Sequence, residues 1–152
     1  MKTNVSYVEK KMFVNEDKRT VACNLKSCIR IPEKYDFMLY EETSFNDFLR
    51  ANPNIVPDYD SDVLYVTTIG KAKCSEDDDF NQAIGEMIAL TKAQAMVFSL
   101  ANTIFVEMLK AINNLYVGDL KSLIDSNATS CSKCKDHVND IYNDYKEFMK
   151  NN

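Results

Sequence analysis

The chain has 152 residues and a mass of 17.4 kDa, a length that normally forms one domain with its own core. Hydrophobic residues make up 45% of it and there are only three Gly and three Pro, which excludes a disordered chain. The formal net charge is −5, and no basic stripe is visible, which excludes generic nucleic-acid binding. We therefore expect a single domain over residues 1–152.

The beginning of the chain, MKTNVSYVEKKMF, has no apolar segment of the kind found in signal peptides. The longest uncharged apolar run lies between Lys92 and Glu107, and it is too short and too polar to span a bilayer. The five cysteines are an odd number in a chain without an export signal, which is typical of free thiols in a reducing compartment. These features predict a cytoplasmic protein without a membrane partner.

The strands are predicted from alternating apolar and polar residues. Residues 20–31 alternate most clearly, with Val21, Cys23 and Leu25 on one face and Pro32 after the end. The segment 35–42 is a second predicted strand, which we expect to form a hairpin with the first. A further strand is predicted at 6–14, closed by the NEDK turn.

Residues 43–62 are the irregular part of the predicted sheet region, which extends over about 5–74. A short helix is expected after Thr43 or Ser44, and the following PNIVPDYDSD segment has the composition of a loop. A strand returns at 63–74, and one of its faces becomes small towards Gly70 and Ala72.

A long helix is predicted over about 77–116. Ser75 is a suitable N-cap residue, and the acidic run Glu76–Asp79 would then occupy the first turn, where the helix dipole favours negative charge. Small residues recur at every fourth position, which allows the helix to approach the small face of the preceding strand closely. They are Gly85, Ala89, Ala93, Val97 and Ala101.

From about residue 95 the helix is apolar around more than half of its circumference, which is more than one sheet can cover. Gly118 is a plausible helix stop, followed by a short helix at 119–125, a linker and an amphipathic helix at 131–149. Either that last helix or another subunit is expected to cover the excess. The predicted fold is α+β: an antiparallel sheet of three to four strands, then a helical part over about 77–150.

Catalytic and metal sites find little support. Consecutive acidic residues on a helix point in different directions, so the run at 76–79 needs a second acidic segment to hold a cation. Cys131, Cys134 and His137 have ligand-like spacing, but a second pair is missing, and whether they bind zinc stays open. With one histidine and no glycine-rich phosphate loop, we expect a protein that is not an enzyme and has no cofactor or metal.

Aromatic residues are concentrated in the middle third of the chain, near several cations. A pocket that combines aromatic and basic side chains suits nucleotides, because bases stack and phosphates accept charge-assisted hydrogen bonds. The alternative is that these residues only pack the core. The candidate ligand-binding residues are Arg30, Arg50, Tyr65, Lys71 and Lys73.

The segment GKAKCSEDDDFNQAIGEMIALTKAQA resembles a pattern of small phage and prophage proteins, in which a small-residue strand, an acidic turn and a Gly/Ala-rich helix follow one another. The matching positions are Gly70, Ala72, Cys74, Asp77, Asp79, Phe80, Gly85, Ala89 and Ala93. The resemblance covers about 25 residues, each of which also has a structural explanation, so it implies a fold and a viral origin more than an activity.

The resemblance implies a protein acting in a bacterial host, where small phage proteins often counter antiviral defence. The leading hypothesis is a non-catalytic protein that sequesters a small nucleotide-like immune signal as a homo-oligomer joined through the long helix. The alternatives are an acidic inhibitor of a host defence effector, for example a CRISPR nuclease, and a structural or regulatory module without a ligand.

Overall fold

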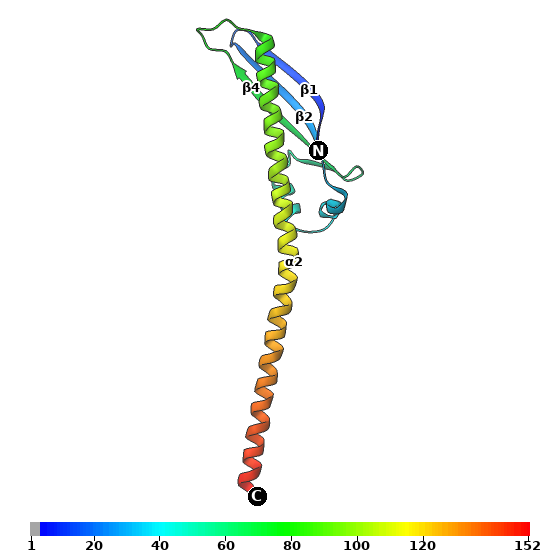
Figure 1. Ribbon diagram of the computed structural model, residues 1–152, viewed down its shortest axis with the longest axis vertical. Coiled ribbons are helices and arrows are strands. Elements are labelled where there is room, and N and C mark those ends of the chain that lie inside the picture. Colours follow the sequence, from blue (N-terminus) through cyan, green and yellow to red (C-terminus); the bar gives the residue numbers. More distant parts are fainter. Residues whose placement is uncertain (1–3) are drawn as a thin grey trace. The chain divides into compact units, whose positions relative to one another are not determined.

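The computed structural model describes residues 4–152, and it contains a four-stranded antiparallel sheet and a long helix (Figure 1). The chain forms two compact units that divide between Ala111 and Ile112. The elements in order are β1 (Val5–Asn15), β2 (Thr20–Arg30), the 3₁₀ helix η1 (Glu33–Leu39), α1 (Ser44–Ala51), β3 (Val56–Asp58), β4 (Val63–Lys73) and α2 (Gln82–Asn151). The predicted α+β fold class is confirmed.

The sheet has the strand order β1-β2-β4-β3. The strands expected at 6–14, 20–31 and 63–74 correspond to β1, β2 and β4, and the NEDK turn joins the first two. β3 pairs with β4 only as far as Tyr65, so no strand in the described chain pairs with the outer edge of β4 beyond that residue.

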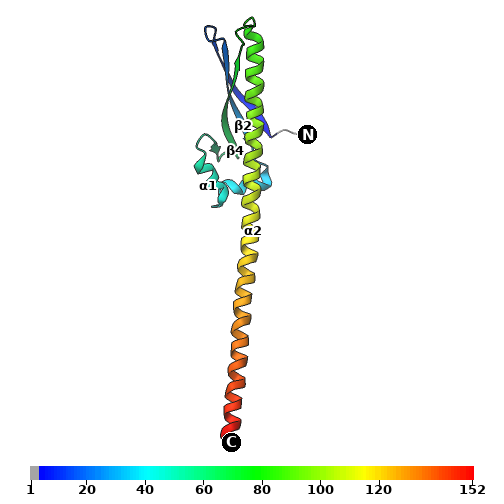
Figure 2. The same cartoon turned by 90° about the vertical axis from the view of Figure 1, so that its left-hand side faces the viewer.

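One face of the sheet packs against the first part of α2 (Figures 1 and 2). The predicted buried face of β2 is confirmed, since Val21, Cys23 and Leu25 are at most 1% exposed. Gly70 on β4 lies directly beneath the helix backbone: a Cβ there would collide with the carbonyl oxygen of Ala89. Close packing between the small strand face and the small helix stripe is therefore confirmed.

A side-chain hydrogen bond fixes this close approach. Thr68 is buried, and its Oγ1 donates to the carbonyl oxygen of Ala93 over 2.9 Å. Lys92, one residue earlier on the helix, donates from Nζ to the Lys71 carbonyl oxygen over 3.0 Å. The helix is thus positioned on β4 by backbone contact and by two polar contacts.

The strand expected at 35–42 is wrong, because Glu33–Leu39 forms the 3₁₀ helix η1. Both edges of β2 are already occupied, by β1 on one side and by β4 on the other, so a third partner has no place. The apolar residues Met38 and Leu39 are instead buried by the helical turn.

The short helix expected in the irregular segment is confirmed as α1. Its N-cap is Thr43, whose Oγ1 accepts from the Phe45 amide over 3.2 Å, while the Asn46 side chain accepts from the Thr43 amide. The short strand β3 lies in the stretch expected to be entirely loop.

The expected start of the long helix is wrong. α2 begins at Gln82, and Asn81 is its cap, since Asn81 Oδ1 accepts from the Ile84 amide over 3.1 Å. Ser75 Oγ accepts instead from the Asp77 amide in a tight turn. The four acidic side chains are exposed in this loop.

The expected break at Gly118 is also wrong, because α2 continues as a single helix from Gln82 to Asn151. A glycine ends a helix by adopting a left-handed conformation, and none of the described glycines has a positive φ. The separate helices predicted at 119–125 and 131–149 are therefore parts of α2.

By length and composition alone, α2 is apolar enough to cross a membrane, with a mean hydropathy of 1.5 over its best window. Helices in the cores of soluble proteins have the same property. Val97, Ala101 and Ile104 are buried, so one face of this stretch belongs to the protein core.

Candidate functional site

The open face of the sheet, which points away from α2, holds four of the five predicted binding residues. Arg30 on β2 and Tyr65, Lys71 and Lys73 on β4 alternate with the buried residues of their strands. Tyr65 and Lys73 are separated by about 26 Å at roughly 3.3 Å per strand residue. The structure therefore brings Lys71 and Lys73 together, but not all four.

Tyr65 and Arg30 lie towards the other end of the face. The Lys26 Nζ is 5.1 Å from the centre of the Tyr65 ring, which is a cation–π contact. Arg30 is exposed on the same face of β2.

Arg50 lies on α1, and its guanidinium forms ion pairs with two neighbouring carboxylates. Its guanidinium contacts Glu42 at 2.8 Å and Asp47 at 3.0 Å, and the hydrogen bond and charge of Glu42 raise the Arg50 pKa above its usual value. These carboxylates compete with any anionic ligand for the guanidinium.

The lysine pocket is a hollow at the end of the sheet near the β1–β2 turn, with a volume of about 710 Å³. Its floor on the open face consists of two neighbouring cross-strand rows, Phe13–Ala22–Lys71 and Asn15–Thr20–Lys73. The residues that line it are Phe13, Val14, Asn15, Thr20, Val21, Ala22, Lys71, Ala72, Lys73 and Lys92.

The charge of this pocket is opposite to that of the whole chain. Lys71, Lys73 and Lys92 line it, and its described lining contains no carboxylate. Phe13 adds an aromatic ring that is 56% exposed. Lys71 and Lys73 on the same sheet face as an exposed ring match the phosphate and base of a nucleotide, and the volume lies within the usual range of small-ligand sites.

Sequence reasoning selected Lys71 and Lys73 but missed Phe13, Asn15, Thr20 and Lys92. The strand alternation of β1 places Phe13 and Asn15 on one face, and that signal was available. Which residues of β2 and β4 lie beside Phe13 and Asn15 could not be predicted, because the cross-strand rows depend on the register between β1, β2 and β4.

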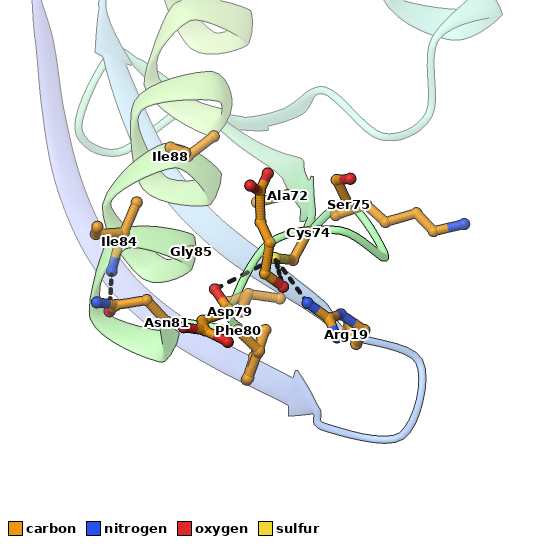
Figure 3. Close-up of a pocket in the computed structure, with 13 residues that line it drawn as sticks. Arg19, Ala72, Cys74, Ser75, Asp79, Phe80, Asn81, Ile84, Gly85 and Ile88 are labelled. Atoms are coloured by element: carbon orange, nitrogen blue, oxygen red, sulfur yellow. Dashed lines mark hydrogen bonds between the residues drawn. The ribbon is translucent and has the colours of Figure 1, made fainter.

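A second hollow, the Cys74 pocket, has a volume of about 430 Å³ and lies where β4 leads into α2 (Figure 3). Arg19 Nη2 contacts the Cys74 sulfur at 3.4 Å, and the same sulfur lies 3.7 Å and 3.6 Å from the carbonyl oxygens of Asp78 and Asp79. Arg19 also has a positive φ of 53° and its amide donates to Glu16. These contacts hold the acidic loop against the β1–β2 turn.

Tyr40 joins the irregular segment to the start of β4. Its hydroxyl lies 2.7 Å from Asp62 Oδ1 and 2.6 Å from the Tyr59 carbonyl oxygen. The hydrogen bond to Asp62 raises the pKa of Tyr40 to about 12. Because the bond requires the protonated phenol, its contribution to stability is present below pH 10 and is lost as the pH rises through about 12.

Cys131, Cys134 and His137 are all exposed on α2. Among the described residues, no group of three or more His, Cys, Asp or Glu side chains is arranged to hold a metal ion. Cys23 differs from these thiols because it is buried, and burial raises its pKa.

Comparison with protein-family models, with curated proteins and with solved structures gives no match to this chain. Its site must therefore be interpreted from its own geometry.

Proposed function

We propose that this protein is a non-catalytic binding protein that holds a small nucleotide-like anion in the lysine pocket. The observation that carries the proposal is that Lys71 and Lys73 line the same pocket as the exposed Phe13 ring, with no carboxylate in the described lining. Lys92 reaches the pocket from α2, on the other face of the sheet, where its Nζ is bound to the Lys71 carbonyl oxygen. Lysines bind phosphate oxygens as point charges, and the ring offers a face on which a base stacks.

The polar residues of the pocket add selectivity to this attraction. Asn15 provides an amide and Thr20 a hydroxyl, and both lie in the same row as Lys73. Such neutral groups hydrogen-bond to a sugar or a base edge without repelling phosphate. Asp78 and Asp79 of the acidic loop line the neighbouring Cys74 pocket, which shares Val21, Ala72 and Lys73 with the lysine pocket.

Self-association through α2 is the second part of the proposal. Outside its buried stripe, α2 carries the exposed apolar side chains of Ile84, Ile88, Phe98 and Leu109, which are 44–57% exposed. An apolar stripe of this length on a helix is a typical protein–protein contact. Several copies joined in this way would carry several lysine pockets.

The biological role that we propose is sequestration of a nucleotide immune signal in the cytoplasm of a bacterial host. Its support is the resemblance of residues 70–95 to small phage proteins, together with a pocket suited to phosphate. A sequestering protein needs affinity and copy number rather than catalysis.

The test is nucleotide binding by the full chain and by pocket variants. Purified protein is incubated with a panel of mono-, di- and cyclic nucleotides, and retained ligand is released by heat and identified by mass spectrometry. Each of Lys71→Ala and Lys73→Ala is expected to weaken binding by about ten- to a hundredfold, since a charge-assisted hydrogen bond contributes roughly 1.5–3 kcal/mol.

The matched control is Lys26→Ala, which removes a lysine from the same sheet face outside the pocket. It should leave the affinity nearly unchanged. Equal losses in all three variants would indicate general charge attraction, and no retained nucleotide would refute the proposed ligand.

The alternative function is inhibition of a basic defence protein through the acidic loop. The observation that favours it is the exposure of all four side chains from Glu76 to Asp79. Substitution of these residues by their amides would abolish inhibition in that case, whereas nucleotide binding in the lysine pocket would remain.

A further inference from the structure

We propose that residues 117–148 of α2 pair with the same residues of a second copy in a parallel, two-stranded coiled coil. The proposal rests on the self-association through α2 proposed above, but places it in a later stretch of the helix, beyond Leu109, and names its partner and orientation. The lysine pocket belongs to the other unit, so nucleotide binding and this pairing can fail separately.

The segment follows a heptad pattern in which Asn127 is the one polar residue among the a and d positions. The a positions are Val117, Ile124, Cys131, Val138 and Tyr145. The d positions are Leu120, Asn127, Cys134, Ile141 and Phe148. The spacing alternates three and four residues without interruption for about four and a half heptads, which exceeds the three to four that indicate a coiled coil.

The remaining faces of the helix are polar. At the b, c and f positions between Asp119 and Glu147, every residue is Asp, Glu, Asn, Ser, Thr or Lys. Apolar side chains are therefore confined to one stripe and its flanks, as in a helix that meets a single partner.

This part of the helix needs a partner to be stable. Every described side chain from Asn113 to Asn152 is exposed, and Ile124 and Leu120 are 66% and 61% exposed. The segment is rich in Ser, Asn, Asp and Thr, which are weak helix formers, and in proteins most helical stability comes from packing. A second copy provides that packing along about 48 Å of helix.

The residue types favour two strands. Val117, Ile124 and Val138 are β-branched at a, and Leu120 is at d, a combination that favours dimers over higher oligomers. Ile141 at d departs from this combination.

Asn127 determines the orientation. In a parallel, in-register pair Asn127 faces Asn127 of the second copy, and the two amides hydrogen-bond to each other. In the fully overlapping antiparallel pair, a positions face d positions, so Asn127 would face Val138 and lose its partner. A buried unpaired amide is unfavourable, so the pairing is parallel.

Cys131 and Cys134 make the orientation measurable. In the parallel pair each cysteine faces the same cysteine of the second copy, whereas in the antiparallel pair Cys131 of one copy faces Cys134 of the other. Starting from a full chain with Cys28→Ser and Cys74→Ser, we add either Cys131→Ser or Cys134→Ser, treat with a mild oxidant and analyse on non-reducing gels. Both single-site variants are expected to form covalent dimers, which the variant lacking both cysteines does not.

If neither variant cross-links, the parallel coiled coil is refuted. A mass of three or more chains by light scattering before oxidation would refute the two-stranded form. Serine is close to cysteine in size, and all four substituted positions are at least partly exposed, so folding is expected to be preserved in each variant.

Discussion

At the scale of single residues, Gly70 is the position at which β4 and α2 approach most closely. A Cβ on Gly70 would clash with backbone atoms of Ala89 and lie 2.6 Å from the Ala93 amide nitrogen. Backbone cannot move aside as a side chain can. The glycine is therefore required by the contact with the helix, although its φ is not positive.

We expect Gly70→Ala to lower the free energy of unfolding by roughly 3 kcal/mol, the upper part of the range for overpacked cores. The measurement is urea denaturation followed by fluorescence of the tyrosines.

The matched control is Gly118→Ala. Nothing lies within 4 Å of a Cβ at Gly118, which is in the interior of α2, so alanine should stabilise the helix by about 0.5–1 kcal/mol. A destabilisation of similar size in both variants would contradict the account of Gly70.

The sequence predicts correctly those features that follow from a local pattern within one segment. It does not predict features that depend on contacts with other segments of the chain. The small stripe of Gly85, Ala89 and Ala93 and the small end of β4 could be matched from the sequence, because both follow from periodicity. The acidic run was assigned to a helix start by a capping pattern at Ser75, while Asn81, a few residues later, provides the cap that the structure uses.

The same limit applies to the candidate site. Lys71 and Lys73 could be selected as cations on one strand face, but the ring of Phe13 joins them only through two strand pairings. Arg50, selected from the same kind of pattern, lies on α1 and is paired with Glu42 and Asp47.

At the scale of elements, α2 carries two different apolar patterns. Up to Ala111 its buried residues follow the sheet, and from Val117 its apolar residues follow heptads. The heptad spacing is present in the sequence, but Gly118 and the segment SNATS predict an interruption of the helix, so the heptads are not evident from the sequence alone. Glycine and serine weaken a helix by roughly 1 kcal/mol or less each, which packing outweighs.

We expect Ile141→Glu to unfold much of the second unit, because it places a charge in the apolar seam. The association constant should fall more than a hundredfold, since loss of a buried isoleucine costs roughly 3 kcal/mol before the charge is counted. Circular dichroism should show lower helicity that no longer depends on concentration.

The control for this variant is Asn143→Glu at an f position, which adds the same charge outside the seam. It should leave helicity and association unchanged. Equal helix loss in the two variants would show that charge, rather than the seam, determines the effect.

At the scale of the whole molecule, the sheet unit contains the lysine pocket, and the helical unit is the part that we propose to join two copies. The single domain expected from the length of the chain stays a prediction, and contacts group the chain into two compact units that divide at Ala111. Length cannot reveal that division, because an exposed helix adds residues without adding core.

The most direct test is the mass of the full chain in solution, measured by sedimentation equilibrium under reducing conditions over a range of concentrations. We expect a mass of twice 17.4 kDa at micromolar concentrations, with dissociation only on dilution. A single species of 17.4 kDa at tens of micromolar, with α2 still fully helical, would contradict it.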